Sequence, residues 1–326
     1  FTTLLRRVHS AHSRSGSILS HRVLVFGVGE EAENVGRVLR KSDPDIQIVG
    51  YYPCATETEI VVPVQVVLSQ EMSLSDTAQS LRVDEIIVAV RERRGGALPL
   101  RELLDCKLSG VRVLDLASYF ERALGQLRLD SLRVGWMIFG EGFRQNWRRT
   151  SVKRLFDVVV ASALLLLSLP VMMLTAILIV LEDGLSIFYR QERVGLDGRL
   201  FKVIKFRSMF NDAESDGKPR WATLDDDRVT RVGRLIRKLR IDELPQLYNV
   251  LVGDMSLVGP RPERPYFVDQ LTRDIPFYAV RHSVKPGLTG WAQVMYQYGA
   301  TVEDSVQKLQ YDLYYVKKHT LLLDIL

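Results

Sequence analysis

Alternating apolar and polar positions mark the first part of the chain as a series of strands and helices. The segment EEAENVGRVLRKS, from Glu30, separates two apolar runs and completes a strand–helix–strand pattern. Such alternation predicts βαβ units around a parallel sheet. We therefore predict a small α/β domain over residues 21–149. Its strands are expected in HRVLVFGVG from His21, IQIVGYYP from Ile46, VDEIIVAV from Val83 and GVRVLDL from Gly110.

An uncharged apolar run, VVVASALLLLSLPVMMLTAILIVL, extends from Val158 to Leu181. It reaches the roughly 20 residues that a membrane-spanning helix needs. Pro170 near its centre removes a helical hydrogen bond and favours a kink, where the Ser168 hydroxyl could bond the freed backbone. Three interpretations stay open: a spanning helix, a buried core helix, and a bent hairpin that enters one leaflet and returns to the same face.

Basic residues lie directly before the apolar run. Arg148, Arg149, Lys153 and Arg154 precede it, as expected for a cytoplasmic flank. Over the whole chain, 44 basic and 39 acidic side chains give a net charge of +5, which favours anionic partners such as phosphates, nucleotides or lipid headgroups. The two cysteines stand far apart without a CxxC pattern, so neither a disulfide framework nor a zinc site is indicated.

Two adjacent carboxylates, Asp242 and Glu243, come just before apolar residues at helical spacing, and Pro245 suits a first helical turn. A helix N-terminus stabilises ionised carboxylates and also attracts phosphate. Aspartate is a competent nucleophile toward phosphorus, and a second carboxylate can assist a proton transfer or hold a divalent metal. The alternative is an ordinary helix cap.

The neighbourhood of the carboxylates is rich in groups that suit a diphosphate. Basic residues precede the pair, and the rigid turn GPRP that follows could aim Arg261 inward or make an ordinary connection. In KPGLTGWAQV, glycines could admit a ligand and Trp291 could face a nucleobase, a membrane interface or simply the core. A solvated helix face would explain the basic cluster, Arg231, Arg234, Arg237, Lys238 and Arg240, equally well.

Taken together and in order, these motifs resemble a known family. KRLFDVVV, the proline-broken apolar run, RVGLDGRLFKVIKFRSM, the segment with IDELPQLYNVLVGDMSLVGPRP, and KPGLTGWAQV occur as in the bacterial monotopic phosphoglycosyl transferases. The resemblance covers just over half of the chain. It implies an α+β membrane-associated catalytic domain over 150–326 with a re-entrant membrane hairpin over 155–181. One departure concerns the bend, where Leu169 separates Ser168 from Pro170.

The same resemblance implies a reaction. Asp242 would attack the sugar-linked phosphate of a UDP-sugar and release UMP. Undecaprenyl phosphate, the polyprenyl acceptor, would then take the sugar phosphate from the aspartyl intermediate. Mg²⁺ is the implied cofactor, held at Asp242 and Glu243, and Glu243 would assist proton or metal handling. This would be the first membrane step of a surface glycan such as exopolysaccharide or O-antigen, at the cytoplasmic face of the bacterial inner membrane.

Further site residues follow from the matching motifs. Phosphate contacts are expected from Arg237 and Arg261, with Lys205 and Arg207 as further candidates. Lys153 and Arg154 would anchor the hairpin at lipid headgroups, and Ser168 and Pro170 would form its bend. A homodimer is expected and a nucleic-acid partner is not. The resemblance also makes residues 1–20 a linker from an upstream membrane region.

A glycine fingerprint marks the N-terminal domain as Rossmann-like. Gly27, Gly29 and Ala32 form G-x-G-x-x-A after a strand, the start of a dinucleotide-binding motif. The acidic residue that should follow about 20 positions later is missing from IQIVGYYPC, and Glu30 and Glu31 place negative charge where a pyrophosphate would dock. We expect a structural or dimer-forming domain.

Two rival functions remain from the sequence. One is a membrane-tethered nucleotide-sensing module in which Asp242 and Glu243 only cap a helix. The other is an NAD-dependent sugar-nucleotide enzyme, which the missing acidic residue disfavours. The pattern does not identify the sugar.

Overall fold

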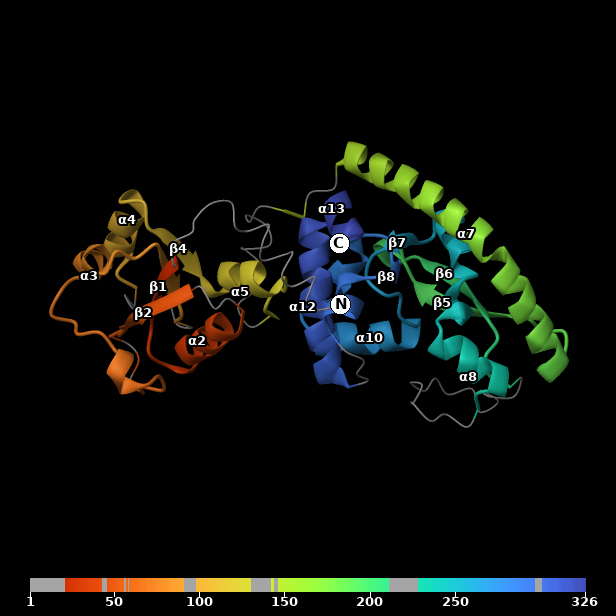
Figure 1. Ribbon diagram of the computed structural model, residues 1–326, viewed down its shortest axis with the longest axis horizontal. Helices are drawn as coiled ribbons and strands as arrows, with labels where there is room; N and C mark the ends of the chain where they lie inside the picture. Colours follow the sequence, from red (N-terminus) through yellow and green to blue (C-terminus); the bar gives the residue numbers. More distant parts are fainter. Residues whose placement is uncertain are drawn as a thin grey trace. The chain divides into compact units, whose positions relative to one another are not determined.

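The computed structural model describes residues 21–42, 46–55, 57, 59–90, 98–129, 142–143, 146–210, 228–296 and 301–326 (Figure 1). The predicted linker over 1–20 lies outside these residues. Two compact units make up the chain, Phe1–Trp136 and Met137–Leu326. A domain boundary near Thr150 stays a prediction.

The N-terminal unit is built on the predicted parallel sheet. Its strands have the order β2-β1-β3-β4, and each neighbouring pair runs parallel. All four lie within the apolar runs from which strands were predicted. Their bounds are β1 His21–Phe26, β2 Ile46–Tyr52, β3 Glu85–Val88 and β4 Arg112–Asp115.

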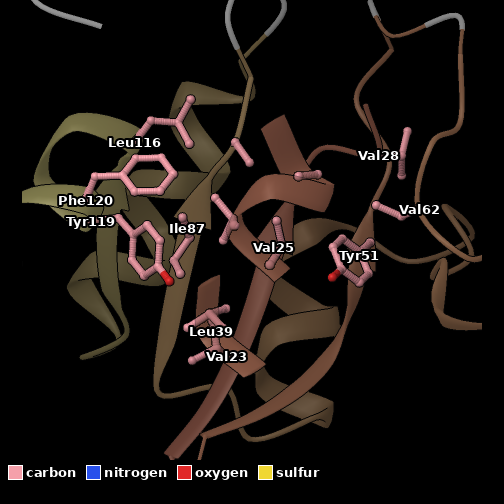
Figure 2. Close-up of a cluster of buried hydrophobic side chains, with 13 residues drawn as sticks. Val23, Val25, Val28, Leu39, Tyr51, Val62, Ile87, Leu116, Tyr119 and Phe120 are labelled. Atoms are coloured by element: carbon pink, nitrogen blue, oxygen red, sulfur yellow. The ribbon is translucent and has the colours of Figure 1, made fainter. Parts of the chain in front are cut away.

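Helices cover both faces of this sheet. Successive side chains of a strand point to opposite faces, so Val23 and Val25 of β1 pack with α2 (Glu30–Ser42) and α5 (Leu116–Leu124), as Figure 2 shows. Leu24 and Phe26 pack on the other side with α3 (Leu74–Ser80) and α4 (Leu100–Leu108). The short helix η1, Val64–Val66, follows β2. This arrangement is compatible with the predicted Rossmann-like domain.

One long helix, α7 (Trp147–Asp183), contains the apolar run. Within the described ranges it is the helix long and apolar enough to cross a membrane, and only 11% of its most apolar window is buried. That exposure argues against a buried core helix. The helix continues through Pro170 and, in Figure 1, curves without folding back on itself. The structure therefore does not confirm the re-entrant hairpin, which stays a prediction.

The C-terminal unit combines helices with two small sheets, in agreement with the α+β prediction. β5 (Phe188–Val194) pairs antiparallel with β6 (Leu200–Phe206), and β7 (Ser256–Val258) pairs parallel with β8 (Gly287–Thr289). The LFKVIKF segment thus forms the predicted strand. The remaining elements are η3 Leu196–Gly198, α8 Arg231–Lys238, η4 Ile241–Glu243, α9 Gln246–Val252, α10 Pro265–Asp274, η5 Tyr278–Ser283, α11 Trp291–Met295, α12 Val302–Lys318 and α13 Leu321–Ile325.

Both halves of α7 pack against this unit. Ala161 joins a buried cluster with Val203 of β6 and Leu247 of α9. A second cluster joins Ile179 to Phe206 and Ile236. The outer side of α7 leaves large apolar side chains exposed, among them Leu155, Val159, Leu166, Leu167, Met173, Leu174, Ile177 and Leu181.

Polar contacts fasten both ends of α7 to the same unit. Near its start, Arg154 donates to the carbonyl oxygens of Val250 and Leu251, at 2.5 and 2.7 Å, at the end of α9. Near its end, Glu182 accepts hydrogen bonds from the backbone amides of Arg231 and Val232, at 2.8 and 2.9 Å, at the start of α8. Neither end of the helix is therefore separated from the unit that contains Asp242.

Candidate active site

The predicted carboxylate pair lies in a tight turn between two helices. α8 ends at Lys238, and Arg240 then adopts a left-handed backbone with φ of 58°, which redirects the chain. Asp242 and Glu243 follow in η4, and α9 begins at Gln246 after Pro245. The placement of both carboxylates directly ahead of a helix is confirmed.

Glu243 is held by three cationic side chains. Its Oε1 lies 2.7 Å from Arg261 Nη2, 3.1 Å from Lys205 Nζ and 3.4 Å from Arg240 Nη1. Burial by itself would raise the pKa of this carboxyl, but the charges of Arg261 and Lys205 and their hydrogen bonds lower the pKa to about 2. Glu243 is therefore ionised at any physiological pH and gathers the three cations around one oxygen.

Asp242 has a different environment from its neighbour. The residue is 8% exposed, and its Oδ1 is buried without a hydrogen-bond partner. Burial raises the pKa of this carboxyl, opposed by the charge of Lys205 and, more weakly, by Arg237 and Arg240. A buried carboxylate oxygen without a partner is rare, because its desolvation is uncompensated. Asp242 thus keeps a carboxylate oxygen without a partner, whereas the Oε1 of Glu243 is shared by three cations.

Asn249 fixes β6, and with it Lys205, against the carboxylates. Its side-chain Oδ1 accepts from the backbone amide of Ile204 at 3.1 Å, and its Nδ2 donates to the Lys202 carbonyl at 2.9 Å. Both backbone groups belong to the strand that carries Lys205. Asn249 was not predicted as a site residue, since an asparagine on a helix gives no local sign of a distant strand partner.

The GPRP turn directs Arg261 toward Glu243. The KPGLTG segment is hydrogen-bonded to this turn through backbone groups. The Gly259 amide donates to the Thr289 carbonyl at 2.9 Å, and the Gly287 amide donates to the Pro260 carbonyl at 3.0 Å. A Cβ at either glycine would collide with the opposing backbone, so both positions require glycine for close approach. These two glycines therefore bring backbone to backbone.

Trp291 follows this segment at the start of α11. Its side chain is buried and stacks on Tyr314, with ring centroids 5.9 Å apart. Of the alternatives considered for Trp291, the structure supports packing in the core.

Arg237 and Arg207 are the other two predicted phosphate contacts. The charge of Arg237 lowers the pKa of Asp242. Arg207 is buried and pairs with Asp183 at the end of α7, with Nη2 3.1 Å from Oδ2 and 2.7 Å from the carbonyl. A phosphate contact from either arginine stays a prediction.

The predicted membrane-anchoring residues are engaged within the protein. Lys153 Nζ lies 2.6 Å from Asp324 and 3.8 Å from Asp157, and Arg154 bonds the end of α9 as described above. The Ser168 hydroxyl donates to the Leu165 carbonyl at 3.1 Å, one turn before Pro170. Headgroup contacts from Lys153 and Arg154, and the bend at Ser168 and Pro170, stay predictions.

Asp157 is a second residue of this unit that was not predicted from the sequence. It is 3% exposed on α7 and accepts from the Ser256 hydroxyl at 2.8 Å and from the Leu257 amide at 3.3 Å. The helix that carries the apolar run is thereby joined to β7, which leads into the GPRP turn.

In the N-terminal unit, a carboxylate of the chain itself occupies the glycine fingerprint. Glu57 Oε2 accepts from the Val28 amide at 2.7 Å, and its Oε1 accepts from the Gly29 amide at 3.2 Å. Loop amides of this kind face the pyrophosphate in dinucleotide-binding domains. Glu31, one of the two acids expected to repel a ligand, pairs instead with Arg128 at 3.1 Å. Glu57 was missed because it lies far along the chain from the loop.

The carboxylate pair could supply the one or two protein ligands that a Mg²⁺ ion usually has. Among the described residues, no group of three or more His, Cys, Asp or Glu side chains could hold a metal. Mg²⁺ typically binds one or two carboxylates together with substrate phosphates and water. The unpartnered Oδ1 of Asp242 is an oxygen of the required kind. A metal that arrives with a diphosphate is therefore compatible with these residues.

Comparisons with known proteins match the part of the chain that contains the carboxylate pair and nearly all of the long apolar helix. The sequence model of the family described as bacterial sugar transferase matches residues 148–326. The chain belongs to this family. The match covers α7 and all the elements that surround Asp242 and Glu243.

Curated relatives carry related names. The chain is 41% identical over 250 residues to UDP-N-acetylgalactosamine-undecaprenyl-phosphate N-acetylgalactosaminephosphotransferase of Aeromonas hydrophila, covering 76% of this chain and 57% of that protein. It is 42% identical over 176 residues to UDP-glucose:undecaprenyl-phosphate glucose-1-phosphate transferase of Escherichia coli K12, covering 53% and 38%. A protein of the latter name from Xanthomonas campestris is 30% identical over 335 residues, covering 99% and 68%. The chain thus spans 57% of the Aeromonas hydrophila protein and 38% of the Escherichia coli protein.

Proposed function

We propose that this chain transfers a sugar 1-phosphate from a UDP-sugar to undecaprenyl phosphate. The observation that carries the proposal is the division of roles between two adjacent carboxylates. Asp242 retains a buried oxygen without a partner, while Glu243 beside it holds Lys205, Arg240 and Arg261. Such a site offers one nucleophile and a set of cations for a diphosphate. The names of the relatives support the substrate classes.

The transfer proceeds in two displacements at one phosphorus atom. A carboxylate oxygen of Asp242 attacks the sugar-linked phosphorus, the bond to the bridging oxygen breaks, and UMP leaves with that oxygen and its electron pair. An oxygen of undecaprenyl phosphate then attacks the same phosphorus, and Asp242 departs as a free carboxylate. Neither displacement consumes a proton, so the carboxylate is regenerated for the next cycle.

The cations around Glu243 suit the charge of the donor. Lys205 and Arg261 have side chains that are 23% and 36% exposed, so both can reach an incoming phosphate without leaving Glu243 entirely. Phosphate contacts from Arg237 and Arg207 belong to the same proposal. When bound at Asp242 and Glu243, Mg²⁺ would supply further neutralisation of the diphosphate charge.

The membrane arrangement is part of the proposal. Because both ends of α7 are fastened to one unit, the exposed apolar side of the helix can enter a bilayer only if both ends stay on the same side. This supports a re-entrant path, and its place in the cytoplasmic leaflet of the bacterial inner membrane is proposed from the resemblance and from the basic residues before the apolar run. Assembly as a homodimer and a place at the first membrane step of exopolysaccharide or O-antigen assembly are proposed from the resemblance alone.

Turnover in detergent solution tests the reaction. Purified protein is incubated with a panel of UDP-sugars, undecaprenyl phosphate and Mg²⁺, and UMP release is followed. With sugar-labelled donor and no acceptor, label should become attached to the protein. Asp242→Asn should abolish both signals, with turnover reduced by about 1,000-fold or more. UMP release that persists in this variant would refute the nucleophile assignment.

Asp197→Asn provides a matched control. Asp197 is an exposed residue of η3 with φ of 54°, a conformation that asparagine also tolerates. The control should keep full turnover. Chelation of divalent metal should stop turnover reversibly and leave the unfolding temperature unchanged, because the carboxylates remain neutralised by cations when the metal is absent.

A further inference from the structure

The GPRP turn depends on donors from elsewhere in the chain. Two of its four residues are prolines, which have no backbone N–H, so the turn has few donors with which to hold itself. Its carbonyl oxygens instead accept from other elements. Pro260 O accepts from the Gly287 amide at 3.0 Å, and Pro262 O accepts from Arg193 Nη1 at 3.2 Å.

The carbonyl of Arg261 itself is held by a buried arginine. Arg281, in η5, is 6% exposed, and its Nη2 donates to Arg261 O at 2.9 Å. The same residue whose guanidinium contacts Glu243 is therefore fixed at its backbone by a second guanidinium. This contact connects the core of the unit to the carboxylate pair.

Asp312 on α12 fixes the orientation of Arg281. Its Oδ2 lies 3.0 Å from Arg281 Nε and 2.7 Å from Nη2, and Arg281 Nη1 donates to the Tyr278 hydroxyl at 3.0 Å. A planar guanidinium can make all these contacts at once, whereas an ammonium group at the end of a lysine cannot. Asp312 is 2% exposed, so the pair is shielded from solvent and from competing salt.

We propose that Arg281, oriented by Asp312, is a positioning residue that sets where Arg261 presents its guanidinium to Glu243 and to the donor phosphate. This inference rests on the proposed transfer at Asp242. Arg281 acts through the Arg261 backbone, and its effect on turnover therefore requires the Arg261 side chain.

A double-mutant cycle on turnover separates positioning from general support of the fold. Arg261→Gln and Arg281→Lys are each expected to lower kcat/KM, the second by about 10- to 100-fold, as small misplacements of catalytic groups do. The double variant should be no slower than Arg261→Gln, within about twofold, because the residue through which Arg281 acts is already removed. Effects that multiply would overturn the inference.

Tyr278→Phe is the matched control. It removes one hydrogen bond from the same guanidinium but leaves the contacts to Asp312 and to the Arg261 carbonyl in place. Its kcat/KM should stay within about twofold of the wild type, even if its unfolding temperature falls as for other lost buried hydrogen bonds. A loss of turnover equal to that of Arg281→Lys would contradict positioning through Arg261.

The stability of each variant is measured separately from its turnover in this experiment. Thermal unfolding is measured for every variant, and Asp312→Asn replaces Arg281→Lys in the cycle if the latter does not fold. A wild type that releases no UMP from any UDP-sugar would refute the proposed function and this inference together. An active wild type with multiplicative losses would refute the inference alone.

Discussion

The Nζ of Lys205 lies 3.1 Å from the Oε1 of Glu243, although 37 residues separate the two along the chain. The lysine comes from β6 and the carboxylate from the turn before α9. Because Lys205 also lowers the pKa of Asp242 by its charge, this one side chain acts on both members of the carboxylate pair.

Removing the Lys205 charge should move the pH dependence of turnover upward. In the proposed transfer Asp242 must be ionised to attack phosphorus, so activity should fall as the pH drops through its pKa, which burial already raises. Lys205→Met removes a charge that lowers this pKa, so the acid limb of kcat/KM should move to higher pH. Glu243→Gln should move it to lower pH, because the charge of Glu243 raises the pKa of Asp242.

Lys202→Met is the control for these pH profiles. Lys202 is exposed on the same strand, and its replacement changes the net charge of the protein by the same amount. Its acid limb should coincide with that of the wild type. A Lys205→Met profile that coincides as well would contradict the assignment of this limb to Asp242.

Asn249→Ala should weaken both stability and turnover. The substitution leaves the Ile204 amide and the Lys202 carbonyl without their partner in a half-buried place, at a cost of about 1 to 2 kcal/mol. It also releases the strand that carries Lys205, so kcat should fall by about 10-fold. Denaturant unfolding and UMP release measure the two effects.

Tyr248→Ala tests the specificity of that result. Tyr248 neighbours Asn249 but is 56% exposed, so its removal should cost about 0.5 kcal/mol or less. Equal losses of stability and turnover in the two variants would mean that the hydrogen bonds from Asn249 to β6 make no specific contribution.

Cysteine labelling should find both ends of α7 on the same side of the membrane. Ser151→Cys and Ser186→Cys place thiols at exposed positions before and after the apolar run, while the native Cys54 and Cys106 are buried. In oriented vesicles a membrane-impermeant maleimide should label both or neither from a given side. Leu167→Cys, in the exposed apolar stretch, should resist labelling until detergent is added. Labelling of the two ends from opposite sides would require a spanning helix instead.

NAD should leave the unfolding temperature of the wild type unchanged. Glu57 already accepts the amides of Val28 and Gly29 that a pyrophosphate would use. Glu57→Gln keeps the shape but loses the charge, and should destabilise the N-terminal unit by about 1 to 2 kcal/mol. Glu59→Gln, at an exposed position two residues away, should change nothing. Saturable stabilisation of the wild type by NAD would contradict this assignment.

Local patterns were sufficient where the physics is local. β1 and α2 were predicted because alternation and helical spacing are visible within a few residues, and the start of α9 was predicted from Pro245 and the apolar spacing beyond it. Arg261 was a candidate because prolines limit the paths that its turn can take.

Long-range contacts were out of reach by the same reasoning. The residues next to Asn249, Glu57 and Arg281 in the sequence do not indicate partners that lie tens of residues away. In the sequence, the buried ion pair of Arg281 with Asp312 cannot be told from two surface charges. Pro170 favoured a kink, yet the helix continues through it, because both halves of α7 pack against the rest of the unit and this packing offsets the cost of an interior proline.

In the proposed transfer, the two-ended attachment of α7 limits how undecaprenyl phosphate can reach Asp242. Helix and unit must move together, so the carboxylate keeps a constant height above the layer in which the exposed leucines lie. A lipid-linked phosphate confined to that layer then searches for the site in two dimensions rather than three. Encounters would depend on the surface density of the proposed acceptor and on its lateral diffusion, whereas the proposed UDP-sugar donor would arrive from bulk water.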